Sequence, residues 1–331
     1  VGSNAGYAVT IGKKNTLIGG LAGDALTDSD SNVAVGYLAL SADTLGQYSV
    51  AIGDNALAAQ NFTTATDAYN VAVGKNAGLS VSTGTFNTFL GGLSGDSVTT
   101  GSFNTLLGTF AGDAITTANS NVAVGYLALS TDTLGAKNVA VGVSALLTQN
   151  FTTATDSFNT GVGHNAGKLI TTGTKNTIMG GLAGDALTTG ITNVAVGYQA
   201  LSSDTAGKRS VAIGNAALFA QNFTTATDTY NVAVGEAAGV AVTTGIENTL
   251  IGGIAGDALT DSDGNVAVGY AALSADTLGS RSTAIGRGAL ALQNFTTAAE
   301  ADNTAVGYSA GLSITTGVKN TLIGTLAGDA L

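Results

Sequence analysis

The sequence predicts an all-β protein, a parallel β-solenoid, and two observations support this fold class. A glycine recurs every 17 residues along the chain, except for four intervals of 21 residues. Before each of these glycines, β-branched and aliphatic residues form a stretch of three that is typical of a short strand. Such a coil leaves no room for a helix, so we expect about nineteen coils of 17 or 21 residues, stacked at ~4.8 Å each.

We call this residue the pacing glycine and number the other positions of a coil from it. The pacing glycines are Gly2, Gly19, Gly36, Gly53, Gly74, Gly91, Gly108, Gly125, Gly142, Gly163, Gly180, Gly197, Gly214, Gly235, Gly252, Gly269, Gly286, Gly307 and Gly324. Position −1 is always aliphatic and position −3 is Val or Thr, as in Val33 and Val35. Position +3 is almost always Ala and opens a second predicted strand, such as residues 39–42, before a return turn that often contains Gly at +10. Each coil is therefore predicted as strand, turn, strand, turn.

Composition excludes several classes of function. The net charge is −11 with only 11 Lys and Arg, which argues against binding to nucleic acid or to anionic membranes. Every apolar run is far shorter than a membrane-spanning helix, so we expect no membrane insertion by this segment. The chain has no Cys, so disulfides and thiolate metal sites are excluded. It also has no Pro, which fits a chain whose N–H groups are needed in ladders.

Position −4 predicts a ladder of asparagines stacked along the solenoid axis, where side-chain amides hydrogen-bond from coil to coil or stabilise turns. The residues of this ladder are Asn15, Asn32, Asn70, Asn87, Asn104, Asn121, Asn138, Asn159, Asn176, Asn193, Asn231, Asn248, Asn265, Asn303 and Asn320.

Position −2 is never polar. If positions −3 and −1 point into the core, position −2 must point out, because side chains alternate along a strand. A strand that is apolar on both faces is buried on both faces, so we expect a second copy of the chain to cover this column. The predicted self-interface consists of Ala34, Ala51, Ala72, Leu106, Ala123, Ala140, Ala195, Ala212, Ala233, Ala267, Ala284 and Ala305.

The four long coils share an inserted motif and define super-repeats of four coils, with one coil added. We place a single continuous array over residues 1–331, with super-repeats at about 2–73, 74–162, 163–234, 235–306 and a partial one at 307–331. The inserted bulges are candidate contact sites for glycans or neighbouring fibres; in the alternative interpretation, each Phe seals a larger turn. Their residues are Asn61, Phe62, Thr63, Asn150, Phe151, Thr152, Asn222, Phe223, Thr224, Asn294, Phe295 and Thr296, and each Asn-Phe-Thr is also an N-glycosylation triplet.

No catalytic, cofactor or metal site is predicted. His164 is the only histidine and lies in a variable column, so no His-based triad can recur. The acids at position +5 repeat with the coils, whereas an active site needs one singular arrangement: Asp24, Asp96, Asp113, Asp185, Asp257 and Asp329. The Asp-rich turns at residues 28–32 and 261–265 faintly resemble calcium loops, but we interpret them as solvated turns.

The strings NVAVGYLAL, SVAIGDNALA and NTAVGYSAG, together with residues 210–214, resemble two groups of proteins. One is the head of trimeric autotransporter adhesins, with SVAIGxxAxA repeats; the other is the tail-fibre-like proteins of phages and bacteria, with NTAVGYxAL repeats. The resemblance implies a left-handed β-roll, a homotrimer, and a location outside the cell, on its surface or on a virion appendage.

The sequence therefore predicts a non-enzymatic extracellular fibre, the shaft or head of a trimeric adhesin or tail-fibre-like appendage. Its partners would be itself and a host-surface glycan or protein, recognised through many weak contacts. The alternative is a structural filament subunit that polymerises end to end through open strand edges. Ice binding and an enzyme on a β-solenoid scaffold fit the sequence less well. Neither terminal coil carries a polar cap, so we expect a segment of a longer protein.

Overall fold

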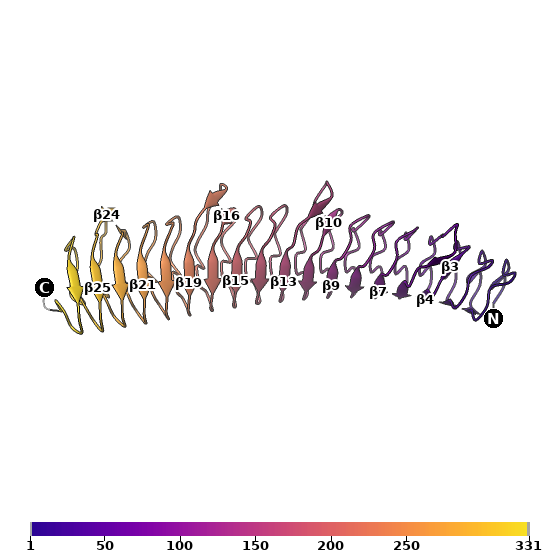
Figure 1. The fold of residues 1–331 in the computed structure, drawn as a ribbon, viewed down its shortest axis with the longest axis horizontal. Helices are drawn as coiled ribbons and strands as arrows, with labels where there is room; N and C mark the ends of the chain where they lie inside the picture. Colours follow the sequence, from indigo (N-terminus) through magenta and orange to yellow (C-terminus); the bar gives the residue numbers. More distant parts are fainter. Residues whose placement is uncertain (1, 330–331) are drawn as a thin grey trace. The chain divides into compact units, whose positions relative to one another are not determined.

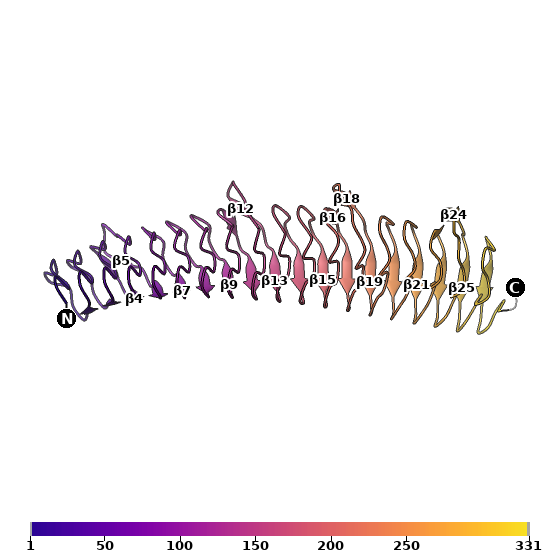
Figure 2. The same ribbon diagram turned by 180° about the vertical axis from the view of Figure 1, so that it is seen from behind.

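The computed structural model describes residues 2–329, which contain strands and turns but no helix. They fall into two compact units, unit 1 (Val1–Gly161) and unit 2 (Val162–Leu331). In each unit the strands run parallel and stack coil upon coil, as Figures 1 and 2 show. The described residues form about 18 turns of β-solenoid, which confirms the predicted fold class. Val1 and the last two residues of the partial super-repeat at 307–331 lie outside the described residues.

Unit 1 contains one strand of three residues in each coil and four strands of two residues beside the bulges. The three-residue strands are β1 (Thr16–Ile18), β2 (Val33–Val35), β4 (Val50–Ile52), β6 (Val71–Val73), β7 (Thr88–Leu90), β8 (Thr105–Leu107), β9 (Val122–Val124) and β11 (Val139–Val141). The two-residue strands are β3 (Gly46–Gln47), β5 (Thr66–Asp67), β10 (Gly135–Ala136) and β12 (Thr155–Asp156). Strand β13 (Thr160–Val162) contains the boundary between the units.

Unit 2 repeats this arrangement. Its three-residue strands are β14 (Thr177–Met179), β15 (Val194–Val196), β17 (Val211–Ile213), β19 (Val232–Val234), β20 (Thr249–Ile251), β21 (Val266–Val268), β23 (Thr283–Ile285), β25 (Thr304–Val306) and β26 (Thr321–Ile323). Its two-residue strands are β16 (Gly207–Lys208), β18 (Thr227–Asp228), β22 (Gly279–Ser280) and β24 (Ala299–Glu300). Equivalent residues pair directly, as Val194, Ala195 and Val196 of β15 do with β17.

The pacing glycine is required by the close approach of successive coils. Gly36 has φ 140°, and a Cβ built on it would lie 2.3 Å from the carbonyl oxygen of Gly53. In unit 2, Gly197 has φ 136°, and its Cβ would lie 2.4 Å from the carbonyl oxygen of Gly214. Both the backbone conformation and the available space therefore exclude a side chain at this position.

The prediction of a second strand after position +3 of each coil is wrong. Residues 39 and 40 lie in a turn and residues 41 and 42 in irregular structure. This segment still bonds from coil to coil, since the Leu38 N–H donates to Gly20 O and the Leu40 N–H to Ala56 O, each at 3.0 Å. Leu38 and Leu40 both have φ 54°, in the left-handed region, which breaks the extended backbone that a strand needs. The ladder of hydrogen bonds continues here without strand geometry.

Position −2 lies in the core, which corrects the predicted self-interface. The −2 side chains are buried within a single chain, except that Leu17 and Leu322 in the end coils are half-buried. They face the residue at +4 of the same coil. A large residue at −2 requires a small one at +4, and the reverse also holds. A Cβ on Gly23 at +4 would lie 2.8 Å from the side chain of Leu17 at −2, whereas the small Ala34 at −2 leaves room for Leu40 at +4. The corrected residues, all 0% exposed, are Ala34, Ala51, Ala72, Leu106, Ala123, Ala140, Ala195, Ala212, Ala233, Ala267, Ala284 and Ala305.

Positions −3 and −1 face outward instead. We call them the outer sheet face, which consists of the first and last residues of each three-residue strand. Each of these residues is Val, Thr, Ile, Leu or Met, so the face has no charged side chain in the described part of either unit. Leu90 in unit 1 is 47% exposed and Ile213 in unit 2 is 37% exposed. The apolar column that a partner could cover is thus one residue away from the one predicted.

The asparagine column joins successive coils and is buried, except that Asn15 and Asn320 in the end coils are half-buried. The Oδ1 of Asn15 accepts from the backbone N–H of Asn32 at 2.9 Å, and the Nδ2 of Asn32 donates to the carbonyl oxygen of Gly46 at 2.8 Å. Direct amide-to-amide bonds are longer, such as 3.2 Å from Asn104 Nδ2 to Asn87 Oδ1. Each Asn thereby satisfies backbone groups that the three-residue strands leave without partners.

Candidate functional site

The four bulges are the main departures from a uniform coil. Each lies in the last coil of a super-repeat and ends in a two-residue strand that pairs with the coil before it, as Thr66 of β5 does with Gly46 of β3. The loops labelled β12 and β18 in Figure 2 rise above the coils next to them within their own units. Thr63, Thr152, Thr224 and Thr296 are exposed at these bulges.

The phenylalanines of the bulges are buried, with 6% of Phe62 and Phe151 and 7% of Phe223 and Phe295 exposed. They seal the larger turn, which corrects their assignment as surface-contact residues. Burial of an aromatic ring in a turn of this size is favoured by the apolar area it removes from water. A partner of the bulge would contact the exposed polar residues around it.

A buried polar cluster, which the sequence analysis missed, holds each bulge in place. Asp43 Oδ1 accepts from the N–H groups of Phe62 at 3.0 Å and Gly46 at 3.1 Å, and its Oδ2 accepts from Gln60 Nε2 at 2.6 Å. Gln60 Oε1 in turn accepts from Asn70 Nδ2 at 2.9 Å. We call this cluster the clasp, and its Asp and Gln are fully buried.

The clasp recurs with the same geometry at all four bulges. Its Asp and Gln residues are Asp43 and Gln60, Asp132 and Gln149, Asp204 and Gln221, and Asp276 and Gln293. A sequence signal exists: these residues stand at position +7, where other coils have Val, Leu or Ile facing the core. A Cβ on Gly46 would lie 2.1 Å from Asp43 Oδ2, which explains the glycine at +10 of the coil before the bulge.

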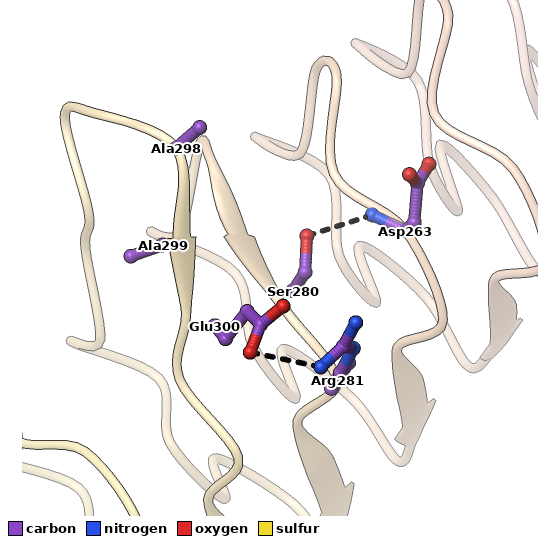
Figure 3. Close-up of a pocket in the computed structure, with 6 residues that line it drawn as sticks. All are labelled: Asp263, Ser280, Arg281, Ala298, Ala299 and Glu300. Atoms are coloured by element: carbon purple, nitrogen blue, oxygen red, sulfur yellow. Dashed lines mark hydrogen bonds and ion pairs between the residues drawn. The ribbon is translucent and has the colours of Figure 1, made fainter.

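Two of the bulges, one in each unit, form an open notch with the coils before them. Figure 3 shows the notch of unit 2, about 270 Å³, lined by Asp263, Ser280, Arg281, Ala298, Ala299 and Glu300. The Arg281 guanidinium and the Glu300 carboxylate face each other at 2.9 Å, and Ser280 Oγ accepts from the Asp263 N–H at 3.0 Å. The charged groups of Arg281 and Glu300 in this notch therefore pair with each other.

Unit 1 has an equivalent notch of about 390 Å³, lined by residues that include Asn119, Ala136 and Asp156. Here Lys137 pairs with Asp156 at 2.6 Å, in the place of Arg281 and Glu300. The frame of the bulge is the same in the two notches, but the lining differs. Such surface ion pairs contribute little to stability, so the lining is free to vary.

Four aromatic side chains stack on the surface of unit 1 at position −5, beside the outer sheet face. Ring centroids are 5.0 Å apart for Tyr48 and Tyr69, 5.6 Å for Tyr69 and Phe86, and 5.2 Å for Phe86 and Phe103. We call them the aromatic ladder. Each ring is 40–59% exposed, so the ladder extends the apolar surface of this unit.

Burial perturbs several carboxyl groups. It raises the pKa of Asp43 and Asp204 in the clasp, against the hydrogen bonds that favour the charged form. At position +5, partial burial and the neighbouring charge of Asp96 raise the pKa of Asp113 to about 6. Asp113 Oδ1 is buried without a hydrogen-bond partner, so the charged form is poorly compensated.

The remaining candidates do not gather into a site. His164 is exposed. In the Asp-rich turns, Asp30 accepts from the Lys13 N–H at 2.5 Å and Asp263 from the Ile246 N–H at 2.8 Å, so both carboxylates cap backbone groups. Within residues 2–329, no three His, Cys, Asp or Glu side chains lie close enough together to hold a metal ion.

A scan against protein-family models found no match for this sequence, and a search of curated proteins found none either. Among the described residues there is also no helix of the length and apolar character that crossing a membrane requires.

Proposed function

We propose that this chain is the shaft or head of a non-enzymatic, extracellular attachment fibre, assembled from three copies, of the adhesin or tail-fibre type. The outer sheet face is the observation that supports this most strongly. It presents two uncharged, mostly β-branched side chains per coil along each unit. An apolar surface of this extent on a soluble protein marks an interface.

A second copy of the chain is the partner that fits this face best. Side chains on the face repeat at the ~4.8 Å spacing of stacked strands, so only a partner with the same spacing contacts every rung equally. Another copy of the chain has the same spacing because it consists of the same coils. If the copies are related by closed symmetry, the assembly is finite. In unit 1 the aromatic ladder continues the same surface and adds area to the contact.

The bulges and notches are the proposed contacts to a host-surface glycan or protein. They lie in turns, on a rigid frame held by the clasp, and their linings differ between copies. Each notch is small and open, so a single one would bind weakly. Attachment would depend on many such contacts acting together in one assembly.

Light scattering of the purified chain tests the proposal. We expect a mass of three copies, and we expect Leu90→Lys and Ile213→Lys to lower the mass because they place a charge on the outer sheet face. Thr152→Lys and Thr224→Lys, on the bulges, are matched controls that should leave the mass unchanged. A wild-type monomer would contradict the proposal, and indefinite polymers would favour the end-to-end filament.

A further inference from the structure

Three successive coils of unit 2 place Tyr270, Arg287 and Tyr308 in one column at position +1. The carbon of the Arg287 guanidinium lies 5.6 Å from the ring centroid of Tyr270 and 6.0 Å from that of Tyr308. The rings are 55% and 49% exposed. Cation–π contacts on both sides hold the guanidinium in place, and Arg287 is exposed to solvent.

Arg287 also differs from the other two arginines of the chain in its partners. Arg209 pairs with Asp228 and Arg281 pairs with Glu300. Within residues 2–329 no carboxylate lies within ion-pair distance of Arg287. In a chain with a net charge of −11, this is a positioned cation without a counter-charge. It is therefore free to take an anionic group from a ligand.

The two tyrosines and the arginine line a notch of about 180 Å³, together with Ala271, Gly288 and Ser309. A guanidinium binds a carboxylate through two parallel hydrogen bonds, with a geometry that an ammonium cannot reproduce. The flanking phenol rings supply a flat apolar wall and a hydroxyl, which suits a ligand that is apolar on its ring face and polar at its edge.

We propose that this notch binds a carboxylate-bearing sugar, with Arg287 holding the carboxylate and Tyr270 and Tyr308 flanking the sugar ring. The inference rests on the proposed attachment function and names the ligand class of one of its contact sites. Because the notch is small and open, it takes one sugar residue at a time. Tight attachment then requires several copies of the site on one assembly.

The test is a titration of the full chain with methyl glucuronide, followed by NMR of the arginine Nε–H signals. The chain has three arginines, so Arg209→Gln, Arg281→Gln and Arg287→Gln assign all three signals. We expect methyl glucuronide to shift the Arg287 signal saturably. Arg287→Gln should weaken binding by at least about tenfold, as measured by saturation transfer to the sugar, because a charged hydrogen-bond pair is lost.

Arg281→Gln is the matched control, since its guanidinium is already paired, and it should leave binding unchanged. Methyl glucoside, which lacks the carboxylate, should not shift the Arg287 signal. Three results would each overturn the proposal. The first is a glucoside that shifts the Arg287 signal as much as the glucuronide does, and the second is an Arg287→Gln variant that binds the glucuronide normally. The third is sodium sulfate that binds as well as the glucuronide and displaces it. If the chain does not bind the glucuronide but still has the mass of three copies, the sugar site is contradicted and the proposed attachment fibre is not.

Discussion

The two units share one frame but carry different surfaces. At position −5, unit 1 stacks four aromatic rings in successive coils, whereas the same position in unit 2 is mostly polar or charged. The unit 2 residues are Lys175, Thr192, Arg209, Tyr230, Glu247, Gly264, Arg281, Asp302 and Lys319. All of them, like the aromatic rings, have φ between 48° and 65°. The backbone fixes the conformation here, and the exposed side chain is free to differ.

This comparison separates what folds the chain from what the chain presents. The pacing glycine and positions −4 and +3 are nearly uniform in both units, and position −2 is always apolar, because these residues lie in the core or between coils. Positions −5 and +1 differ because their side chains lie on the surface and not in the core. Changes in the frame should therefore have equal effects in the two units, and changes at the surface should not.

The largest effect is expected from a charge in the core. Ala123→Lys in unit 1 and Ala195→Lys in unit 2 each bury an unpaired ammonium, so each should cost more than about 4 kcal/mol of unfolding free energy or abolish folding. Val124→Lys and Val196→Lys, one residue away on the outer sheet face, should fold. Urea denaturation followed by circular dichroism checks this. An Ala195→Lys variant as stable as wild type would contradict the position of the core.

Removal of the clasp carboxylate should come next. Asp132→Ala in unit 1 and Asp204→Ala in unit 2 each leave buried N–H donors without an acceptor, at a cost of about 3 kcal/mol in unfolding free energy. Asp156→Ala and Asp228→Ala remove exposed carboxylates of surface ion pairs and should cost less than about 1 kcal/mol. Urea unfolding of the four variants compares them. Equal losses for clasp and surface would show that the clasp does not hold the bulge.

Acidification should stabilise the protein before it denatures it. The pKa of Asp113 is raised to about 6, above its unfolded value, so its contribution is fully present below pH 3.8 and is lost as pH rises through about 6. The raised pKa values of Asp43 and Asp204 act in the same direction. The melting temperature should rise as pH falls from 7 to 5. Asp113→Asn should flatten this rise; an unchanged pH profile in that variant would refute the assignment.

The smallest expected effect distinguishes the two surfaces directly. Tyr69→Ala removes two ring contacts from the aromatic ladder and should cost about 1 kcal/mol of unfolding free energy. Tyr230→Ala, at the same position in unit 2, removes one contact with Arg209 and should cost about half as much. Thermal melts of the two variants measure the difference. Identical shifts in melting temperature for the two variants would mean that stacking in the aromatic ladder does not add to the stability of the fold.

The fold class followed from the glycine spacing, because a repeated unit too short for a helix can stack only as strands and turns. The direction of the side chains did not follow from the same pattern. Val33, Ala34 and Val35 are all apolar, so alternation alone cannot say which faces inward. The deciding signal was the exchange between positions −2 and +4, where Leu17 accompanies Gly23 and Ala34 accompanies Leu40.

The clasp was harder to find because its partners are far apart in sequence. Asp43 and Gln60 are 17 residues apart, and Asn70 follows ten residues later. Their common position in the coil places Asp43 and Gln60 in one column, but a polar residue in a core column is identified as buried only when its hydrogen bonds are known. The tyrosine and arginine column of unit 2 has the same character, since Tyr270, Arg287 and Tyr308 contact one another only through stacking of coils.

The outer sheet face is best tested by thiol reactivity, because the chain has no cysteine of its own. Ile213→Cys places a thiol on that face, and Thr224→Cys places one on a bulge of the same unit. At concentrations that support assembly, alkylation of the thiol in Ile213→Cys should be slow and should speed up on dilution, while that in Thr224→Cys stays fast. Equal and fast alkylation of both thiols at every concentration would contradict self-association through this face.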